Sequence, residues 1–497
     1  MNPSTSNRPI TNADSLMAAI ASSRPIYSKL FMEGDRSIGS FVQSFSTVTL
    51  PAIQDRKDYI DEVAAQVKIS QGAFLAERIR VRLKQNPVVF TANHLCLETM
   101  PLTVQSMVLG ALGEDPGGAL PVEASALIPA DNVSYPVGLT LARRCDGKPF
   151  RIPILELSNK QRRQMTLLLA PFNQLDLSKA LAKVKEHSEA GRIGVKERST
   201  LEHILSEVLN TPTILQCPTF KAQAMAATPR LFDAWFSPEA RKQVPSLAYS
   251  TFESIRTPLL IKDLLDPGTP VFQLFFDPVL REKTLLEMDG VPCCWVKGGR
   301  TGGSALLWEI TPNQRTSPLW LEGDALVSGE GRRFPLEPSA LVEALTRGEL
   351  VPTSFLSLTL GLVRGLVQIG GFNQIDYLAA MQEGLSRAFQ FAGYSEWAAK
   401  LANPIPPMLT AGISGILAAY PEGEWCSAGG VELMAHGGLS PSDLERIKGL
   451  SIREGMGLEL PNIARMVLGG PETQKLADSD RSNHSGSPGN HLIFLNM

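Results

Sequence analysis

The sequence is poor in the residues that bind metals or form disulfides. Six cysteines and six histidines occur in 497 residues, and neither a C-x-x-C nor an H-E-x-x-H motif is present. Cysteines scattered over a long chain argue against a disulfide framework and against a zinc knuckle. We therefore expect mostly buried thiols and no metal site, and the sequence identifies no cofactor.

Net charge and long apolar runs are also lacking. The 47 Lys and Arg against 50 Asp and Glu give a net charge of −3, which provides no basic surface for nucleic acid. Arg364 interrupts the apolar run Phe355–Phe372, and the run Pro406–Tyr420 is shorter than the ~20 residues of a membrane span, so both are expected to be buried helices. Met1–Asn7 has no signal-peptide pattern, so we expect a cytoplasmic protein without a membrane partner.

The remaining composition is that of a globular protein, with 43% hydrophobic and 20% charged residues. We expect an α/β fold with a Rossmann-like doubly wound core, a helical insertion, a small antiparallel β region and a helical C-terminal region. The expected segments are a flexible arm (1–23), the first part of the core (24–156), the helical insertion (157–210), the core continued (211–290), a β-rich segment (291–336), the helical C-terminal region (337–472) and a flexible tail (473–497).

The core is predicted from strand, loop and helix patterns. Pro87–Phe90 is expected to be a buried strand, followed by a polar loop and a helix from Pro101, and Pro121–Pro129 is expected to be a second strand. Loops after parallel strands gather at one edge of a sheet and form a ligand crevice there. Further buried strands are expected at Thr213–Cys217 and Val271–Phe276.

Two later segments differ from the core in their pattern of apolar and charged residues. Leu157–Asn210 mixes charges with apolar residues at helical intervals, so we expect a projecting helical arm that forms a homodimer, with a folded-back subdomain as the alternative. Val291–Leu336 is expected to be an antiparallel meander that includes Cys293 and Cys294 in a strand. Its Gly-rich stretches at Lys297–Ser304 and Gly329–Arg333 are interpreted as hairpin turns rather than phosphate loops.

Three polar constellations are candidates for chemistry. The first, Asn93 and His94, follows a buried strand, where an imidazole could act as a base or could only cap the next helix. The second, Asp131 and Asn132, could orient a substrate or belong to an ordinary turn. The third constellation consists of Gly370, Gly371, Asn373, Gln374 and Tyr377. Its two glycines would allow a ligand to approach the backbone, and the other three residues would supply polar groups from the following helix. The alternative is that the two glycines only form a tight turn.

The order of these motifs resembles the bacillithiol-synthase-type, cysteine-adding enzymes and their uncharacterised relatives, over roughly Pro87 to Phe389. In that family a Gly-Gln-Gln or Gly-His-Gln loop precedes a Gly-Pro-Leu helix start, an Asp-His-Asp segment follows, and a Gly-rich segment ends in Tyr. The matching residues here are His94, Pro101 and Leu102 for the first motif, Asp131 without the adjacent His for the second, and Gly370, Gly371 and Tyr377 for the third.

The resemblance implies a Rossmann-like core, a coiled-coil arm that mediates pairing, and the addition of a small thiol or amine to an activated acceptor without a metal. The incomplete Asp-His-Asp segment implies another substrate or lost activity. We expect a biosynthetic transferase or ligase that acts on small molecules.

In the expected mechanism, His94 is the general base and Asp131 and Asn132 orient the nucleophile. Asn93 and the segment from Gly370 to Tyr377 bind substrate, and His94, Asp131 and Tyr377 should converge on one cleft. A nucleotide-sugar-dependent transferase and a non-catalytic scaffold are the alternatives.

Overall fold

A five-stranded sheet in which all neighbouring strands are parallel forms the centre of the molecule. The computed structural model describes residues 12–145, 148–296, 306–420, 425–457, 459–468 and 493–497. The strands, in spatial order, are β12 (Leu409–Ala411), β11 (Val367–Gly371), β1 (Val88–Phe90), β2 (Ala119–Ala124) and β5 (Ser246–Thr251). The chain therefore runs from β1 outward through β2 to β5 and returns on the other side of β1 with β11 and β12.

Apolar helices pack against this sheet. α6 (Pro101–Leu112) is buried at every position from Thr103 to Leu112 and contacts β12. It begins at Pro101, where the first helical turn needs no N–H donor. α5 (Ala73–Gln85) contacts β2 and β5, α4 (Lys57–Gln71) contacts β5, and α10 (Phe220–Ala234) also contacts β5.

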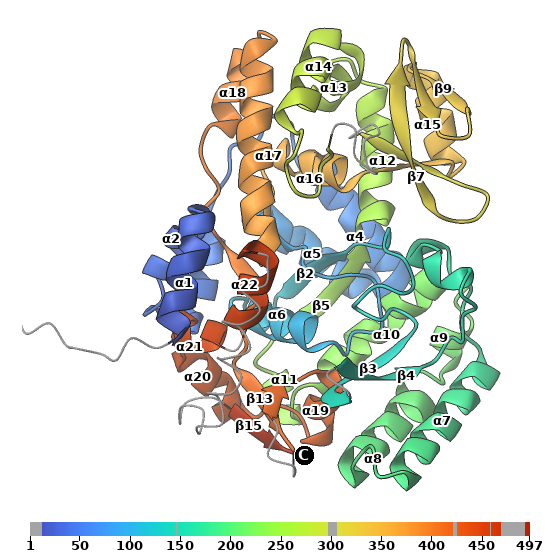
Figure 1. The fold of residues 1–497 in the computed structure, drawn as a ribbon, viewed down its shortest axis with the longest axis vertical. Coiled ribbons are helices and arrows are strands. Elements are labelled where there is room, and N and C mark those ends of the chain that lie inside the picture. The colour runs from blue at the N-terminus through green and yellow to red at the C-terminus, as the bar shows by residue number, and fades with distance from the viewer. Residues whose placement is uncertain (1–11, 146–147, 297–305, 421–424, 458, 469–492) are drawn as a thin grey trace, which may run out of the picture.

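The second sheet is antiparallel, as the sequence predicted. Its order is β10 (Leu350–Pro352), β6 (Leu307–Ile310), β7 (Thr316–Glu322), β8 (Ala325–Ser328) and β9 (Arg333–Pro335). It lies in the upper part of Figure 1 with α12 (Phe252–Leu264), α13 (Pro270–Phe276), α14 (Pro278–Glu287), α15 (Pro338–Thr346), α16 (Ser354–Leu362), α17 (Phe372–Phe391) and α18 (Ser395–Leu401).

Two details of this β-rich segment can be compared with the prediction. The segment Gly329–Arg333 joins β8 to β9 and includes Gly331 at φ 82°, so the predicted turn is confirmed. Cys293 and Cys294 were predicted to lie in a strand, which is wrong, because they lie in a turn before the meander. The predicted hairpin Lys297–Ser304 lies outside the described residues.

Two predicted strands are helices in the structure. Thr213, Ile214 and Leu215 belong to α9 (Pro212–Leu215), and Val271–Phe276 belongs to α13. Each helix has a proline in its first turn, and the Thr269 side chain accepts a hydrogen bond from the N–H of Phe272 at the start of α13. These helix-start signals outweigh the β-branched and aromatic composition of the segments.

The two apolar runs that were expected to be buried helices are only partly helical. Phe355–Phe372 comprises most of α16 and then strand β11. Between them the buried Arg364 forms ion pairs with Asp58 at 2.7 Å and Asp263 at 2.8 Å. Pro406–Tyr420 contains β12 and β13 (Ile416–Ala419), so the helix prediction is wrong there, because short apolar runs do not distinguish the two structures.

The two terminal segments expected to be flexible contain ordered elements. α1 (Asn12–Ser23) buries Leu16, Met17 and Ile20 and packs against α22 (Leu460–Leu468). β15 (Ile493–Asn496) pairs in parallel with β13, which pairs on its other side with β14 (Trp425–Ser427). Both elements therefore contact the body of the protein, and the expected flexibility of the two segments stays a prediction.

Residues 157–210 are helical mainly in their second half. Two short 3-10 turns precede α7 (Gln174–Glu189), α8 (Val195–His203) and the short π-helix η4 (Ile204–Val208). Leu177, Ala180 and Val184 of α7 are buried, and α7 contacts η4 and β4 (Lys148–Pro153), the hairpin partner of β3 (Gly138–Cys145). Much of the predicted apolar stripe is thus covered within the same chain.

None of the helices in the described ranges has both the length and the apolar composition that a bilayer-spanning segment needs.

Candidate functional site

The candidate site is a cavity of about 530 Å³ where three parallel strands end. Its lining includes Thr91 and His94 after β1, Gly371 at the end of β11, and Ala411 and Gly412 at the end of β12. β1 and β11 are the neighbours at which the strand order reverses direction along the chain. Ligands of open parallel sheets bind at this position, outside the carboxyl ends of the strands.

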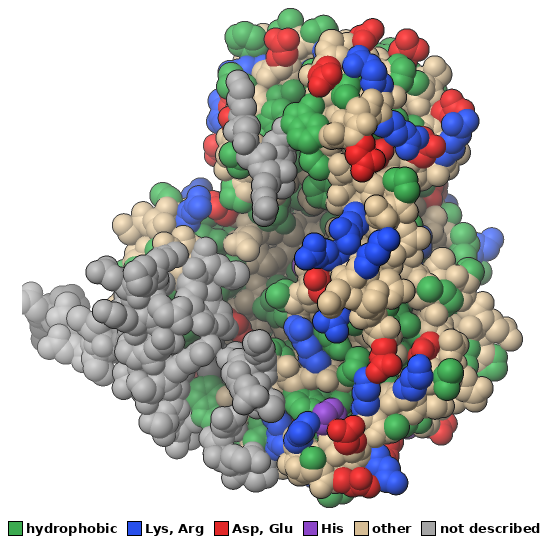
Figure 2. All heavy atoms as spheres, turned by 45° about the vertical axis from the view of Figure 1, so that its right-hand side comes forward, with side chains coloured by type: hydrophobic (Ala, Val, Ile, Leu, Met, Phe, Trp, Pro, Cys, Tyr) green, Lys and Arg blue, Asp and Glu red, His purple; other side chains and the backbone are tan. Residues whose placement is uncertain are grey.

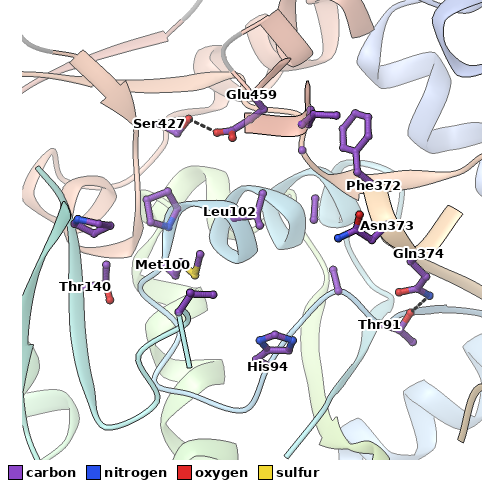
Figure 3. Close-up of a pocket in the computed structure, with 18 of the residues that line it drawn as sticks. Thr91, His94, Met100, Leu102, Thr140, Phe372, Asn373, Gln374, Ser427 and Glu459 are labelled. Carbon is purple, nitrogen blue, oxygen red and sulfur yellow. Dashed lines mark hydrogen bonds between the residues drawn. The ribbon is translucent and has the colours of Figure 1, made fainter. Parts of the chain in front are cut away.

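His94 lies on the wall of this cavity (Figure 3), and a hydrogen bond with Asn132 defines its tautomer. Its Nδ1 is 3.1 Å from Oδ1 of Asn132. That Asn132 atom also accepts the Ser134 N–H at 3.0 Å, so it is the carbonyl oxygen of the amide. His94 Nδ1 must therefore carry the proton and donate it to Asn132, which leaves Nε2 as the unprotonated nitrogen of the neutral ring.

Burial favours the neutral form of this histidine. Desolvation lowers the pKa of His94 below its usual 6.5, against an opposing effect of the hydrogen bond with Asn132. Within the described part of the chain, Nε2 has no hydrogen-bond partner. A neutral ring with a vacant Nε2 lone pair can accept a proton from a bound substrate.

The second wall of the cavity begins at the junction of β11 and α17. Gln374 Nε2 donates to the Thr91 hydroxyl at 2.6 Å and so connects the start of α17 to the end of β1 (Figure 3). A Cβ atom at Gly370 would lie 1.8 Å from Gln374 Oε1, which explains why this position is glycine. Phe372, Asn373 and Gln374 all line the cavity, and no side chain caps the start of α17.

Tyr377 contributes a hydroxyl one turn further along α17. It lines the cavity, as does the Cys293 thiol. Burial raises the pKa of the Tyr377 phenol and of the Cys293 thiol, so both are protonated at neutral pH. Sequence reasoning missed Cys293, because nothing in its local pattern distinguishes it from a buried thiol.

The third wall carries a polar pair that the sequence analysis also missed. The Ser427 hydroxyl donates to Glu459 Oε1 at 3.0 Å and lies 3.1 Å from the Ser414 hydroxyl (Figure 3). Glu459 is the only charged side chain among the described residues that line the cavity, and no Lys or Arg is among them. No sequence motif surrounds Ser427 or Glu459, so their proximity could not be predicted.

The predicted site residues divide into two groups. His94, Gly371, Asn373, Gln374 and Tyr377 line the cavity, and two more lie directly behind it: Asn132, which binds His94, and Gly370, which contacts Gln374. The expected convergence therefore holds for His94 and Tyr377.

Asn93 and Asp131 lie outside this cavity. Asn93 is 1% exposed, and its Nδ2 donates to the buried Glu98 at 2.8 Å. Asp131 lines a second cavity of about 320 Å³. The prediction that Asp131 shares a cleft with His94 and Tyr377 is therefore wrong, because its side chain lies on the other cavity while the adjacent Asn132 binds His94.

Among the residues that the structure describes, no group of three or more His, Cys, Asp and Glu side chains is arranged to hold a metal ion.

Comparisons with known proteins do not identify a family. No family model matches the chain, and no curated protein matches it. The resemblance to bacillithiol-synthase-type enzymes therefore stays a prediction.

Proposed function

We propose that this protein is a transferase or ligase of small-molecule biosynthesis that joins a thiol or amine nucleophile to an activated acceptor in the cavity lined by His94. The proposal includes a Rossmann-like, doubly wound core. The spatial order β5-β2-β1-β11-β12 supports it, because it corresponds to the order 3-2-1-4-5 of that fold.

The observation that carries the proposal is the hydrogen bond between His94 Nδ1 and Asn132 Oδ1. It makes Nε2 a proton acceptor at the cavity wall, and burial keeps the ring neutral. A positioned base of this kind contributes typically 10²–10⁴-fold to a reaction rate.

In the proposed reaction, His94 Nε2 takes the proton of the thiol or ammonium group. The freed electron pair forms the new S–C or N–C bond, and the leaving group departs from the acceptor carbon with the electron pair of the broken bond. The imidazolium then returns its proton to the leaving group or to water. Asn132 orients the ring, and its Oδ1 stabilises the imidazolium through the Nδ1 hydrogen bond.

The acceptor is proposed to lie against the start of α17. The backbone N–H groups in the first turn of a 20-residue helix, together with its dipole, favour a negatively charged group there. The described lining provides no Lys or Arg to balance more charge. A singly charged acceptor therefore suits this cavity better than the diphosphate of a nucleotide sugar.

The test is adduct formation with a labelled nucleophile. Purified protein is incubated with heavy-sulfur cysteine and a pool of small metabolites, and new labelled adducts are counted by mass spectrometry. We expect His94→Ala to lower adduct formation by about 100-fold or more. His203→Ala, a histidine in α8 outside the cavity, should leave it unchanged. An absence of adducts from every pool, or full activity of His94→Ala, would contradict the proposal.

A further inference from the structure

The second cavity, of about 320 Å³, has three basic and two acidic side chains in its lining. Arg151, Arg162 and Lys183 line it, together with Asp131, Glu156 and Tyr135. Arg151 lies in β4 and Lys183 in α7, and the face that carries these elements is turned forward in Figure 2, where basic side chains gather beside a hollow.

The ion pairs of this cavity leave two arginines available. Lys183 is paired with Glu156. Arg151 donates through Nη2 to the Val133 carbonyl at 2.9 Å, but its buried Nε has no partner in the described structure. A buried N–H without a partner carries a desolvation cost that a bound acceptor would offset.

Arg162 is the second available cation. Its side chain is exposed at the cavity and has no hydrogen bond or ion pair within the described ranges. Its backbone carbonyl accepts the Asp131 N–H at 2.9 Å, which holds the two chain segments together. Two arginines against the single carboxylate of Asp131 leave a net positive charge.

Tyr135 completes the cavity in an unusual backbone conformation. Its φ is 51°, which is uncommon for a residue other than glycine, and the Arg151 guanidinium lies 4.7 Å from the centre of its ring. Such conformations persist where the surrounding structure imposes them, and they cluster at ligand sites. The phenol adds a hydrogen-bond donor, because burial raises its pKa.

We propose that this second cavity binds a small organic anion through a carboxylate or phosphate group, with Arg151 and Arg162 as its charged donors. The planar guanidinium fork matches both kinds of oxyanion. The site would share the segment Ala130–Tyr135 with the first cavity, because Val133 lines the first and Asp131 and Tyr135 line the second. It does not depend on the reaction proposed for the first cavity.

Isothermal titration calorimetry with inorganic phosphate and with succinate tests this site. We expect saturable binding of at least one anion, and the tighter one identifies the preferred oxyanion. Arg162→Gln should weaken binding by about tenfold or more. Arg163→Gln is the matched control, because Arg163 is an exposed neighbour in the same short turn and does not line the cavity.

Three outcomes would overturn the proposal: no saturable binding of either anion, unchanged binding by Arg162→Gln, or an equal loss in Arg163→Gln, which would indicate unspecific attraction. Arg151→Gln should also weaken binding by about tenfold. Because Arg151 packs on Tyr135 and could affect folding, the decision rests on the exposed Arg162.

Discussion

The hydrogen bond between His94 and Asn132 determines which ring nitrogen of His94 carries the proton. Asn132 accepts the backbone N–H and the hydroxyl of Ser134, at 3.0 Å and 2.9 Å, so its amide cannot rotate without losing both bonds. His94 therefore meets an oxygen and never an amide N–H at this position. The sequence predicted both residues as site residues, but it assigned Asn132 to the substrate rather than to His94.

A change of Asn132 to aspartate should raise the pKa of His94. The new carboxylate lies beside Nδ1 and favours the charged imidazolium, whereas the pKa of His94 in the wild type is lowered by burial. We expect an increase of about one unit or more, so the basic form of His94 should appear only at higher pH. NMR titration of the imidazole measures this pKa, and His94→Gln identifies the signal by removing it.

Ser134→Ala is the control for this experiment. It removes the hydroxyl bond to Asn132 but keeps the backbone N–H bond, so the His94 pKa should change by only a few tenths. An unchanged His94 pKa in Asn132→Asp would contradict the position of residue 132 beside Nδ1.

The junction of β11 and α17 is the element on which the shape of the cavity depends. Gln374 in the first turn of α17 donates to Thr91 at the end of β1, so the two strand ends that flank the site are connected by a side chain. Gly370 leaves room for Gln374, whereas a Cβ at Gly371 would lie at an ordinary contact distance, 3.4 Å from Ala411 Cβ. The two adjacent glycines therefore have different roles.

Alanine substitution should lower the stability of the protein by different amounts at the two glycines. Gly370→Ala places a methyl group against Gln374 and should lower the free energy of unfolding by about 1–3 kcal/mol, the usual cost of overpacking. Gly371→Ala should cost less than about 1 kcal/mol, because its Cβ meets no close contact. Urea unfolding curves measure both values. Equal losses for the two variants would show that Gln374 does not occupy the space at Gly370.

For the molecule as a whole, the structure limits the apolar surface that the predicted homodimer could use. α7 and α8 bury most of their apolar side chains within the same chain, and α8 packs against α19 (Gly430–Ala435). The large apolar side chains that remain exposed on α7 and α8 are Leu175, at 64%, and Val195, at 84%. A dimer through this region would have to use these two residues.

Light scattering tests the predicted homodimer. We expect the intact protein to have the mass of a dimer and the double variant Leu175→Glu, Val195→Glu to have that of a monomer, because two buried carboxylates would oppose the contact. Leu265→Glu, at an exposed apolar residue that follows α12, should remain a dimer. A monomeric intact protein would contradict the prediction, and a dimeric double variant would place the interface elsewhere.

Local patterns in the sequence were sufficient for part of the fold and of the site. The strand before Thr91, the helix from Pro101 and the helix after Gly371 were predicted, and each is found. These features depend on short-range effects: apolar runs, a proline in the first helical turn, and glycine at a close approach. Strand β11 was not predicted, because the apolar run Phe355–Phe372 was expected to be a helix. His94 was located because it follows a predicted strand, and Tyr377 because it lies at the start of a predicted helix after two glycines.

The other features depend on contacts between residues far apart in the chain. Pairing of β1 with β11, and of β15 with β13, is set by which apolar faces meet, and no local pattern encodes that choice. The direction of a side chain also matters. In extended backbone, consecutive side chains point to opposite sides, so Asn93 enters the interior while His94 lines the cavity. Packing of the surrounding elements determined which neighbour faces the site.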